Sequence, residues 1–207
     1  MSEDRGDRAL ILGVDESKES LVALEWAATE ARARGTALTV CLVSSDPTLL
    51  VGPVVDEIRA RGRATLERLR GQAAELAPGV PVTAEFRIGH PAGQLLALAG
   101  PDAEIVVGHR GTGGFAGLPL GSVSAGIAAH AAGPVVVVRA ALHPDGPVMV
   151  GLDGSDHAPR ALTYAFRHAA RHGVGVQALH AVRDPLDTAA LAVSVSEVDN
   201  RHRLQAA

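Results

Sequence analysis

This chain has few aromatic residues and a single cysteine. Only 2% of its 207 residues are Phe, Trp or Tyr. Cys41 lies inside an apolar run, where we expect a buried structural thiol, and one cysteine excludes a disulfide scaffold within the monomer. The core must therefore be built from Ala, Val, Leu and Gly, which suits buried parallel strands packed by alanine-rich helices.

The chain also has no block of basic residues, and we expect neither a signal segment nor a membrane-spanning run. Its net charge is −4, so we expect neither nucleic acid nor an anionic membrane as a partner. Residues 1–8 are charged and contain no apolar segment. The least polar long window, residues 123–142, is interrupted by His130, Pro134 and Arg139. The cytoplasm is therefore the expected location.

Apolar runs alternate with helix-like segments along most of the chain. We expect a loop at 45–53, strands at 9–14, 37–43, 82–88, 103–107 and 135–138, and helices at 17–34, 55–76, 91–98 and 123–132. Strands that alternate with helices predict an α/β fold with a parallel sheet and helices on both faces.

A glycine-rich segment links the fourth expected strand to the helix that follows. Residues 108–122, GHRGTGGFAGLPLGS, read Gly-x2-Gly-x9-Gly-Ser. Glycines let the backbone approach a ligand closely, and the free N–H groups at a helix start attract anions. Ser122 could cap this helix or donate to a phosphate oxygen. The segment predicts nucleotide binding, although the glycines could also serve only as tight turns.

The pattern of the first strand and helix begins again near residue 148. Residues 148–155 match residues 10–17 at an offset of 138, and Gly35, which should end the first helix, recurs at the same offset as Gly173. This is an internal repeat. Asp153, the counterpart of Asp15, is expected to act only as a helix cap because the second copy has no glycine-rich segment.

The repeat predicts two domains of unequal completeness. Residues 1–143 should form the domain with the complete nucleotide site, and 144–207 a partial second repeat, joined by a hinge at 140–147. We expect a strand, a helix and a strand in the second repeat, and the start of a second helix after Val195. So short a segment buries little core. It should dock elsewhere, exchange with a partner, remain disordered or belong to a truncated chain.

Residues 9–139 resemble the universal stress protein family, in its ATP-binding branch. The glycine-rich segment at 108–122, the turn at 14–17 (VDES) and residues 135–139 (VVVVR) carry the resemblance. It implies an open five-stranded parallel sheet of order 3-2-1-4-5, like the adenine nucleotide alpha hydrolases. It also implies a stress-response module that binds ATP with Mg²⁺. The whole chain looks like a tandem stress protein with an incomplete second repeat.

The resemblance also implies which residues bind the nucleotide. The end of the first strand and Val43 should contact the adenosine, and the glycine-rich segment should follow the ribose and phosphates. Ligands of open parallel sheets bind where the strand order reverses, so Asp15 and Gly108 should meet between the first and fourth strands. Asp15 could instead only cap the first helix. The expected site consists of Val14, Asp15, Val43, Val107, Gly108, Arg110, Gly111, Gly121, Ser122, Val123 and Ser124.

No catalytic residue or metal-ligand set can be named. The sequence has no P-loop and no Rossmann glycine motif after the first strand, so we expect at most slow ATP hydrolysis. The alternative is an adenylate-handling enzyme of a related fold, which usually has paired glycines where this chain has Asp-Glu-Ser at 15–17. A third alternative is a ligand-free scaffold that associates through its sheet edge.

The fifth expected strand should lie at an edge of the sheet. Val135–Val138 is entirely apolar, and an apolar edge invites pairing with another chain. Domains of the family pair at this strand. We therefore predict a homodimer through Val135–Val138.

Overall fold

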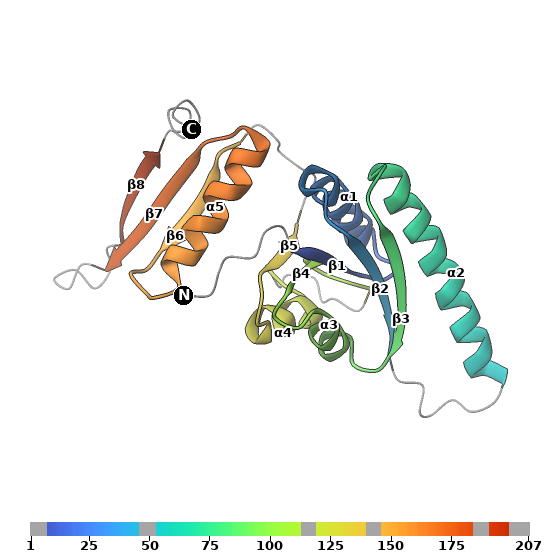
Figure 1. Ribbon diagram of the computed structural model, residues 1–207. Coiled ribbons are helices and arrows are strands. Elements are labelled where there is room, and N and C mark those ends of the chain that lie inside the picture. Colours follow the sequence, from blue (N-terminus) through green and yellow to red (C-terminus); the bar gives the residue numbers. More distant parts are fainter. Residues whose placement is uncertain (1–7, 46–52, 113–118, 140–145, 184–190, 199–207) are drawn as a thin grey trace. The chain divides into compact units, whose positions relative to one another are not determined.

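A computed structural model of the chain describes residues 8–45, 53–112, 119–139, 146–183 and 191–198 (Figure 1). The chain divides into two compact units, Met1–Ala141 and Leu142–Ala207, which are described separately below. The domain boundary expected at residues 143 and 144 lies outside the described residues and stays a prediction. So does most of the hinge expected between residues 140 and 147.

The first unit is a parallel sheet between two pairs of helices (Figure 1). The strand order is β3-β2-β1-β4-β5, so the expected α/β fold is confirmed and β5 is an edge strand. In chain order the elements are β1 (Ala9–Val14), α1 (Lys18–Arg34), β2 (Leu38–Ser44), α2 (Pro53–Leu76), β3 (Val82–Ile88), α3 (Pro91–Ala99), β4 (Ala103–Gly108), α4 (Ser122–His130) and β5 (Val135–Val138).

Helix α1 begins and ends where the sequence predicts. Ser17 is its N-cap, and its hydroxyl accepts a hydrogen bond from the backbone N–H of Ser20 at 3.2 Å. Gly35 ends the helix in the left-handed conformation, with φ 64° and ψ 28°. Asp15 is therefore not the helix cap, and its carboxylate is available for another role.

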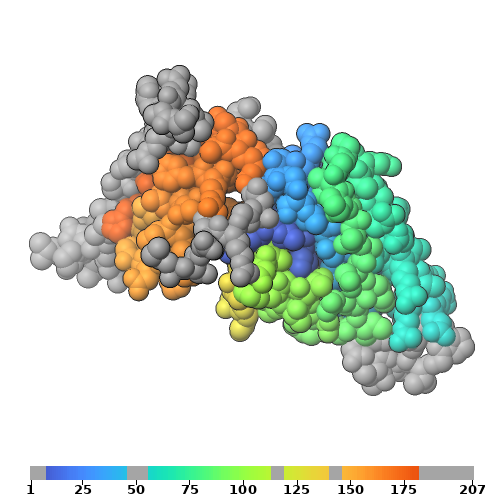
Figure 2. Space-filling view, in the orientation of Figure 1, coloured from blue at the N-terminus to red at the C-terminus, as the bar shows by residue number. Residues whose placement is uncertain are grey.

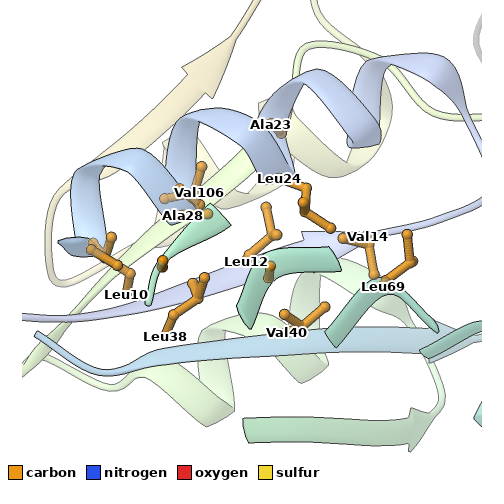
Figure 3. Packing of buried hydrophobic residues seen from close by; sticks show 14 of the residues in the cluster. Leu10, Leu12, Val14, Ala23, Leu24, Ala28, Leu38, Val40, Leu69 and Val106 are labelled. Carbon is orange, nitrogen blue, oxygen red and sulfur yellow. The ribbon is translucent and has the colours of Figure 1, made fainter. Parts of the chain in front are cut away.

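Two apolar layers hold the sheet between its helices. On one face, Leu12 of β1 and Val40 of β2 pack against α1 and α2, and Leu69 of α2 belongs to this layer (Figure 3). On the other face, Ile11 and Ile105 pack beneath α3 and α4. Alternating side chains of one strand thus supply both layers, which explains the continuous apolar runs in the sequence.

Cys41 belongs to the second layer, as the sequence predicts. It is a free cysteine with 0% exposure. Burial raises the pKa of its thiol to about 11, so the group stays protonated and unreactive at neutral pH.

A buried ion network lies on the face of the sheet covered by α1. The guanidinium of Arg34 donates to both carboxylate oxygens of Glu104, at 2.9 and 3.2 Å, and to Glu30 at 2.6 Å. The three side chains are only 5%, 1% and 2% exposed, respectively. Desolvation on its own would lower the pKa of Arg34, but hydrogen bonds and charges of both carboxylates raise it above its usual value.

Helix α2 presents a charged side to solvent. Ion pairs such as Arg61 with Glu57 at 3.3 Å and Arg70 with Glu67 at 2.8 Å lie on this exposed side. Figure 2 shows the outer side of the helix at the surface of the first unit. Among the helices of the described residues, none is long and apolar enough to cross a membrane.

The second unit is a three-stranded sheet with one helix. Strand β6 (Val148–Leu152) runs parallel to β7 (Val176–Arg183), with α5 (Ala158–His172) between them in the chain. Strand β8 (Leu191–Val198) pairs with β7 in the antiparallel direction. Residues 196–198, where the sequence allows a second helix to start, therefore belong to a strand, and residues 199–207 lie outside the described residues. The segment LAVSVSEV is rich in valine, and its residues 193–196 alternate valine with serine, which favours a strand.

The two copies share a strand–helix–strand unit but differ in what covers it. Gly35 and Gly173 end their helices with nearly the same backbone angles, φ 64° and 68°. A Cβ added to Gly13 would lie 2.7 Å from the side chain of Leu95 and 3.1 Å from that of Val107. A Cβ added to its counterpart Gly151 would meet no atom of the described residues within 4 Å. The second copy is thus open at the place where α3 and β4 pack in the first.

Candidate functional site

The candidate site lies where the strand order reverses, between β1 and β4. These strands are parallel neighbours, with Gly13 of β1 opposite Val107 of β4. Asp15 follows β1, and the glycine-rich segment follows β4, so their carboxyl ends lie side by side. The backbone N–H of Thr112 donates to Oδ2 of Asp15 at 2.8 Å. The structure thus brings together the two motifs that the sequence predicts to meet.

The Asp15 carboxylate is surrounded by donors. Its Oδ1 accepts a hydrogen bond from the backbone N–H of Ser17 at 3.0 Å and a second, short one from the Ser17 hydroxyl. The Ser20 hydroxyl donates to the backbone carbonyl of Asp15 at 2.7 Å. Partial burial opposes ionisation, but the hydrogen bonds from Ser17 and Thr112 outweigh it and lower the pKa of Asp15 below 3.8. The carboxylate is therefore charged at neutral pH.

The contribution of this charge to stability has a definite pH dependence. A carboxyl whose pKa is lower in the folded chain than in the unfolded chain stabilises the fold at pH values above the unfolded pKa. For Asp15 the stabilisation is complete at neutral pH and is lost as the pH falls through its folded pKa, below 3.8.

The first glycine of the motif is required by packing. A Cβ added to Gly108 would lie 2.9 Å from the backbone carbonyl oxygen of Glu19, in the first turn of α1, and 3.2 Å from that of Arg110. Both neighbours are backbone atoms and cannot move aside by rotating a side chain. Gly108 therefore lets the end of β4 approach α1 closely.

The second glycine is required by the carboxylate. A Cβ added to Gly111 would overlap Oδ2 of Asp15. The turn formed by Gly111 and Thr112 can lie against Asp15 only because residue 111 has no side chain.

Among the residues that the structure describes, neither the backbone nor its packing requires the third glycine. Gly121 is the N-cap of α4, with φ −76° and ψ 167°, which any residue adopts. A Cβ added there would lie 3.4 Å from Cα of Arg110 and 3.5 Å from the carbonyl oxygen of His109, at ordinary van der Waals distance. The described part of the chain therefore leaves room for a methyl group at this position.

Helix α4 starts slightly earlier than expected. The sequence predicts a helix at 123–132 that Ser122 could cap, but the helix spans Ser122–His130 and Gly121 is its N-cap, without a side-chain capping bond. Ser122 is exposed in the first turn. The Ser124 hydroxyl is buried and lies within hydrogen-bond distance of the carbonyl oxygens of His109, at 3.1 Å, and Gly121, at 3.0 Å. In this structure it therefore holds the start of the helix to the end of β4.

The valines expected to line the site lie on both faces of the sheet. Val14 is 7% exposed and packs in the layer beneath α1 and α2, so its backbone is the part that faces the site. Val107 and Val43 lie on the face covered by α3 and α4, Val107 fully and Val43 partly buried. Arg110 and Val123 are partly buried near the start of α4. Ligand contacts of all these residues stay predictions.

Sequence reasoning missed the roles of Thr112 and Ser20. Thr112 acts through its backbone N–H, which every residue except proline offers, so the residue type carries no signal. Ser20 stands three residues after the N-cap Ser17, a spacing typical of helix starts, and this pattern could have pointed to it. Residues 113–118 of the glycine-rich segment lie outside the described residues.

The second copy repeats only half of this arrangement. Oδ1 of Asp153 accepts a hydrogen bond from the backbone N–H of Ser155 at 2.9 Å, as Asp15 does from Ser17. The N-cap of α5 is His157, so the expectation that Asp153 caps the helix is wrong. An open hollow of about 340 Å³ adjoins this turn, and Gly151 and Leu179 help to line it. Within the described residues of this unit, no glycine-rich loop faces Asp153.

Comparisons with known proteins assign the chain to a family. The model of the universal stress protein family matches residues 8–139 and 146–207. Universal stress protein Rv1996 of Mycobacterium tuberculosis is 34% identical over 215 residues, covering 90% of this chain and 67% of that protein. A universal stress protein structure from Archaeoglobus fulgidus, 24% identical, has a TM-score of 0.71 and covers 89% of this chain and 69% of its own.

A second solved structure is a complex with a nucleotide. It is a universal stress protein in complex with cAMP, with 25% identity, a TM-score of 0.53, and coverage of 65% of this chain and 98% of its own. The matched family model extends over both units of the chain, and the Rv1996 alignment covers most of its length. This chain therefore belongs to the universal stress protein family.

Proposed function

We propose that the first unit binds ATP with Mg²⁺ and acts as a nucleotide-dependent regulatory module of a cytoplasmic stress response, with little or slow ATP hydrolysis. The phosphates would lie at the start of α4, where the backbone N–H groups of Ser122, Val123 and Ser124 point out of the helix. The adenosine would lie between Asp15 and Val43. Bound Mg²⁺ would supply charge neutralisation for the triphosphate.

The observation that carries the proposal is the unexplained glycine at the start of α4. Gly108 and Gly111 have structural reasons to be glycines, whereas no contact with a described residue requires a glycine at position 121. A glycine at a helix N-cap allows a phosphate to approach the backbone closely. Membership of the family and the cAMP complex of a relative support the choice of an adenine nucleotide.

Gly121→Ala should separate ligand binding from folding. The added methyl group has room in the nucleotide-free fold, so the melting temperature should change little. It occupies the space that a phosphate would need, so the affinity for ATP with Mg²⁺ should fall at least about tenfold, or about 1.4 kcal/mol. The measurement is a calorimetric titration of protein freed of copurified nucleotide, in which the wild type should bind near one equivalent.

Gly126→Ala is the matched control. It lies in the same helix, and its added Cβ would also meet its nearest neighbour, Cβ of Ala92, at 3.4 Å. This variant should bind ATP as the wild type does. A folded, nucleotide-free wild type that gives no binding heat contradicts the proposal, as does equal affinity of Gly121→Ala. Turnover above about one per second would instead indicate an enzyme.

We further propose that two copies of the chain pair through β5. The carbonyl groups of Pro134 and Val138 accept hydrogen bonds from the backbone N–H groups of Ile105 in β4, at 3.0 Å, and of His109 just after β4, at 2.8 Å. In a parallel ladder the alternate residues Val135 and Val137 then direct their N–H and C=O groups to the open edge. These groups, on an apolar strand, are available to a partner strand.

Val137→Pro should convert the dimer to a monomer. Proline removes an N–H from the open edge, whereas the bonds between β4 and β5 are kept, so the unit should stay folded. Light scattering at micromolar concentration should give the mass of two chains for the wild type and of one for the variant. Val136→Pro, which removes an N–H directed to β4, should instead destabilise the sheet. A monomeric wild type would refute this pairing.

A further inference from the structure

A single hydrogen bond ties the glycine-rich segment to the end of β1. It joins the Thr112 backbone N–H to Oδ2 of Asp15, residues that are 97 positions apart in the chain. Between β4 and α4, this bond holds the turn at Gly111 and Thr112 against the element that precedes α1. Asp15 thereby acts on the segment itself, through a bond within the chain.

The carboxylate is held in place from its other side. The Ser17 backbone and hydroxyl both donate to Oδ1, which leaves Oδ2 directed at the turn. The Ser20 hydroxyl bonds the carbonyl groups of Asp15 and Ser17, at 2.7 and 3.0 Å. A charged acceptor with a fixed orientation makes a stronger hydrogen bond than a neutral one.

The neighbouring glycine is matched to this contact. A Cβ at residue 111 would overlap the same carboxylate oxygen that accepts from Thr112. The carboxylate of Asp15 can therefore accept from Thr112 in this position because Gly111 has no side chain. Asp153 accepts the same turn bond, from the backbone N–H of Ser155, but its side chain is exposed. In the described part of the second unit, no glycine-rich turn contacts its carboxylate.

We propose that Asp15 is a positioning residue, which latches the Gly111–Thr112 turn onto β1 before a nucleotide binds. The latch orders the entrance to the phosphate site, so that less conformational entropy is lost when the ligand arrives. This role rests on the proposed nucleotide function for its purpose, but the latch itself is a contact within the chain. Asp15 therefore affects affinity through the loop, in addition to any direct contact with the adenosine.

Amide hydrogen exchange in the nucleotide-free full chain tests the latch. Asp15→Ala removes the acceptor, so exchange of the Thr112 amide should accelerate at least about tenfold, while core amides of β1 such as Leu12 keep their protection. Asp153→Ala is the matched control, since it removes the equivalent turn bond in the second copy. It should leave exchange at Thr112 unchanged. Equal acceleration at Thr112 and Leu12 would indicate general destabilisation and overturn the proposal.

Gly111→Ala provides a second, independent variant. It leaves the carboxylate present but pushes it away from the turn. Exchange at Thr112 should again accelerate, and the double variant Asp15→Ala/Gly111→Ala should exchange no faster than either single variant, because all three lack the same bond. Unchanged exchange at Thr112 in both single variants overturns the latch.

A titration with ATP and Mg²⁺ then separates positioning from direct contact. If Asp15 acts by positioning the turn, Gly111→Ala should weaken the binding of ATP severalfold, although Asp15 is still present. Unaltered affinity of Gly111→Ala, with accelerated exchange at Thr112, would overturn the positioning role. If the wild type binds no ATP but the exchange results hold, the proposed nucleotide function fails while the latch remains.

Discussion

Replacing Arg34 by methionine is expected to lower the free energy of unfolding of the first unit by about 3–5 kcal/mol. The guanidinium binds both oxygens of Glu104 and one oxygen of Glu30, and all three side chains are almost fully buried. When the guanidinium is removed, the carboxylates of Glu30 and Glu104 stay in the interior but lose the cation that they share. Methionine keeps most of the side-chain volume, so the loss of stability reports the missing charge and not a new cavity.

Urea unfolding followed by Trp26 fluorescence measures this loss. Trp26 is the single tryptophan of the chain and lies in α1, so its signal reports the first unit. Arg70→Met is the control, because the Arg70–Glu67 pair at 2.8 Å lies on the surface, and its loss should cost less than about 1 kcal/mol. Equal stability of the two variants would show that the buried network contributes no more than a surface pair.

Gly108→Ala should damage both folding and binding. The added methyl group would lie 2.9 Å from the carbonyl oxygen of Glu19, so the end of β4 must move away from α1. We expect a loss of about 1–3 kcal/mol in the free energy of unfolding, as for an overpacked core. Because the segment that follows β4 moves with it, the affinity for ATP with Mg²⁺ should also fall at least about tenfold.

The same urea unfolding and calorimetric titration check Gly108→Ala. Gly93→Ala, in α3, is the control, since its added Cβ would meet nothing within 4 Å, and it should stabilise the helix by up to about 1 kcal/mol. Gly121→Ala, with weakened binding at normal stability, gives the contrasting case. If Gly108→Ala unfolds as the wild type does, the close approach of β4 to α1 is not a constraint on this position.

The local elements were predictable because their signals are local. Ser17 and Gly35 mark the two ends of α1, and the apolar runs mark the strands of the first unit. The segment around Val195 shows the limit of such reasoning, because residues 196–198, which could also start a helix, belong to β8. The alternation of valine and serine over residues 193–196 is the local signal that favours the strand.

The amino-acid sequence by itself determined the α/β class, the internal repeat and the motifs at 14–17 and 108–122, because these depend on periodicity and spacing along the chain. Only the tertiary structure decided which contacts the residues of those motifs make. It showed that packing constrains Gly108 and Gly111 in different ways, and that no contact among the described residues requires a glycine at position 121.

It also placed Glu104, which stands in an apolar run, opposite Arg34 and turned it into part of a buried ion network. The bond between Asp15 and Thr112 joins residues 97 positions apart. Such contacts depend on which strands become neighbours and on how closely their ends approach. The pairing of β1 with β4 sets both, and no local pattern in the sequence encodes those distances.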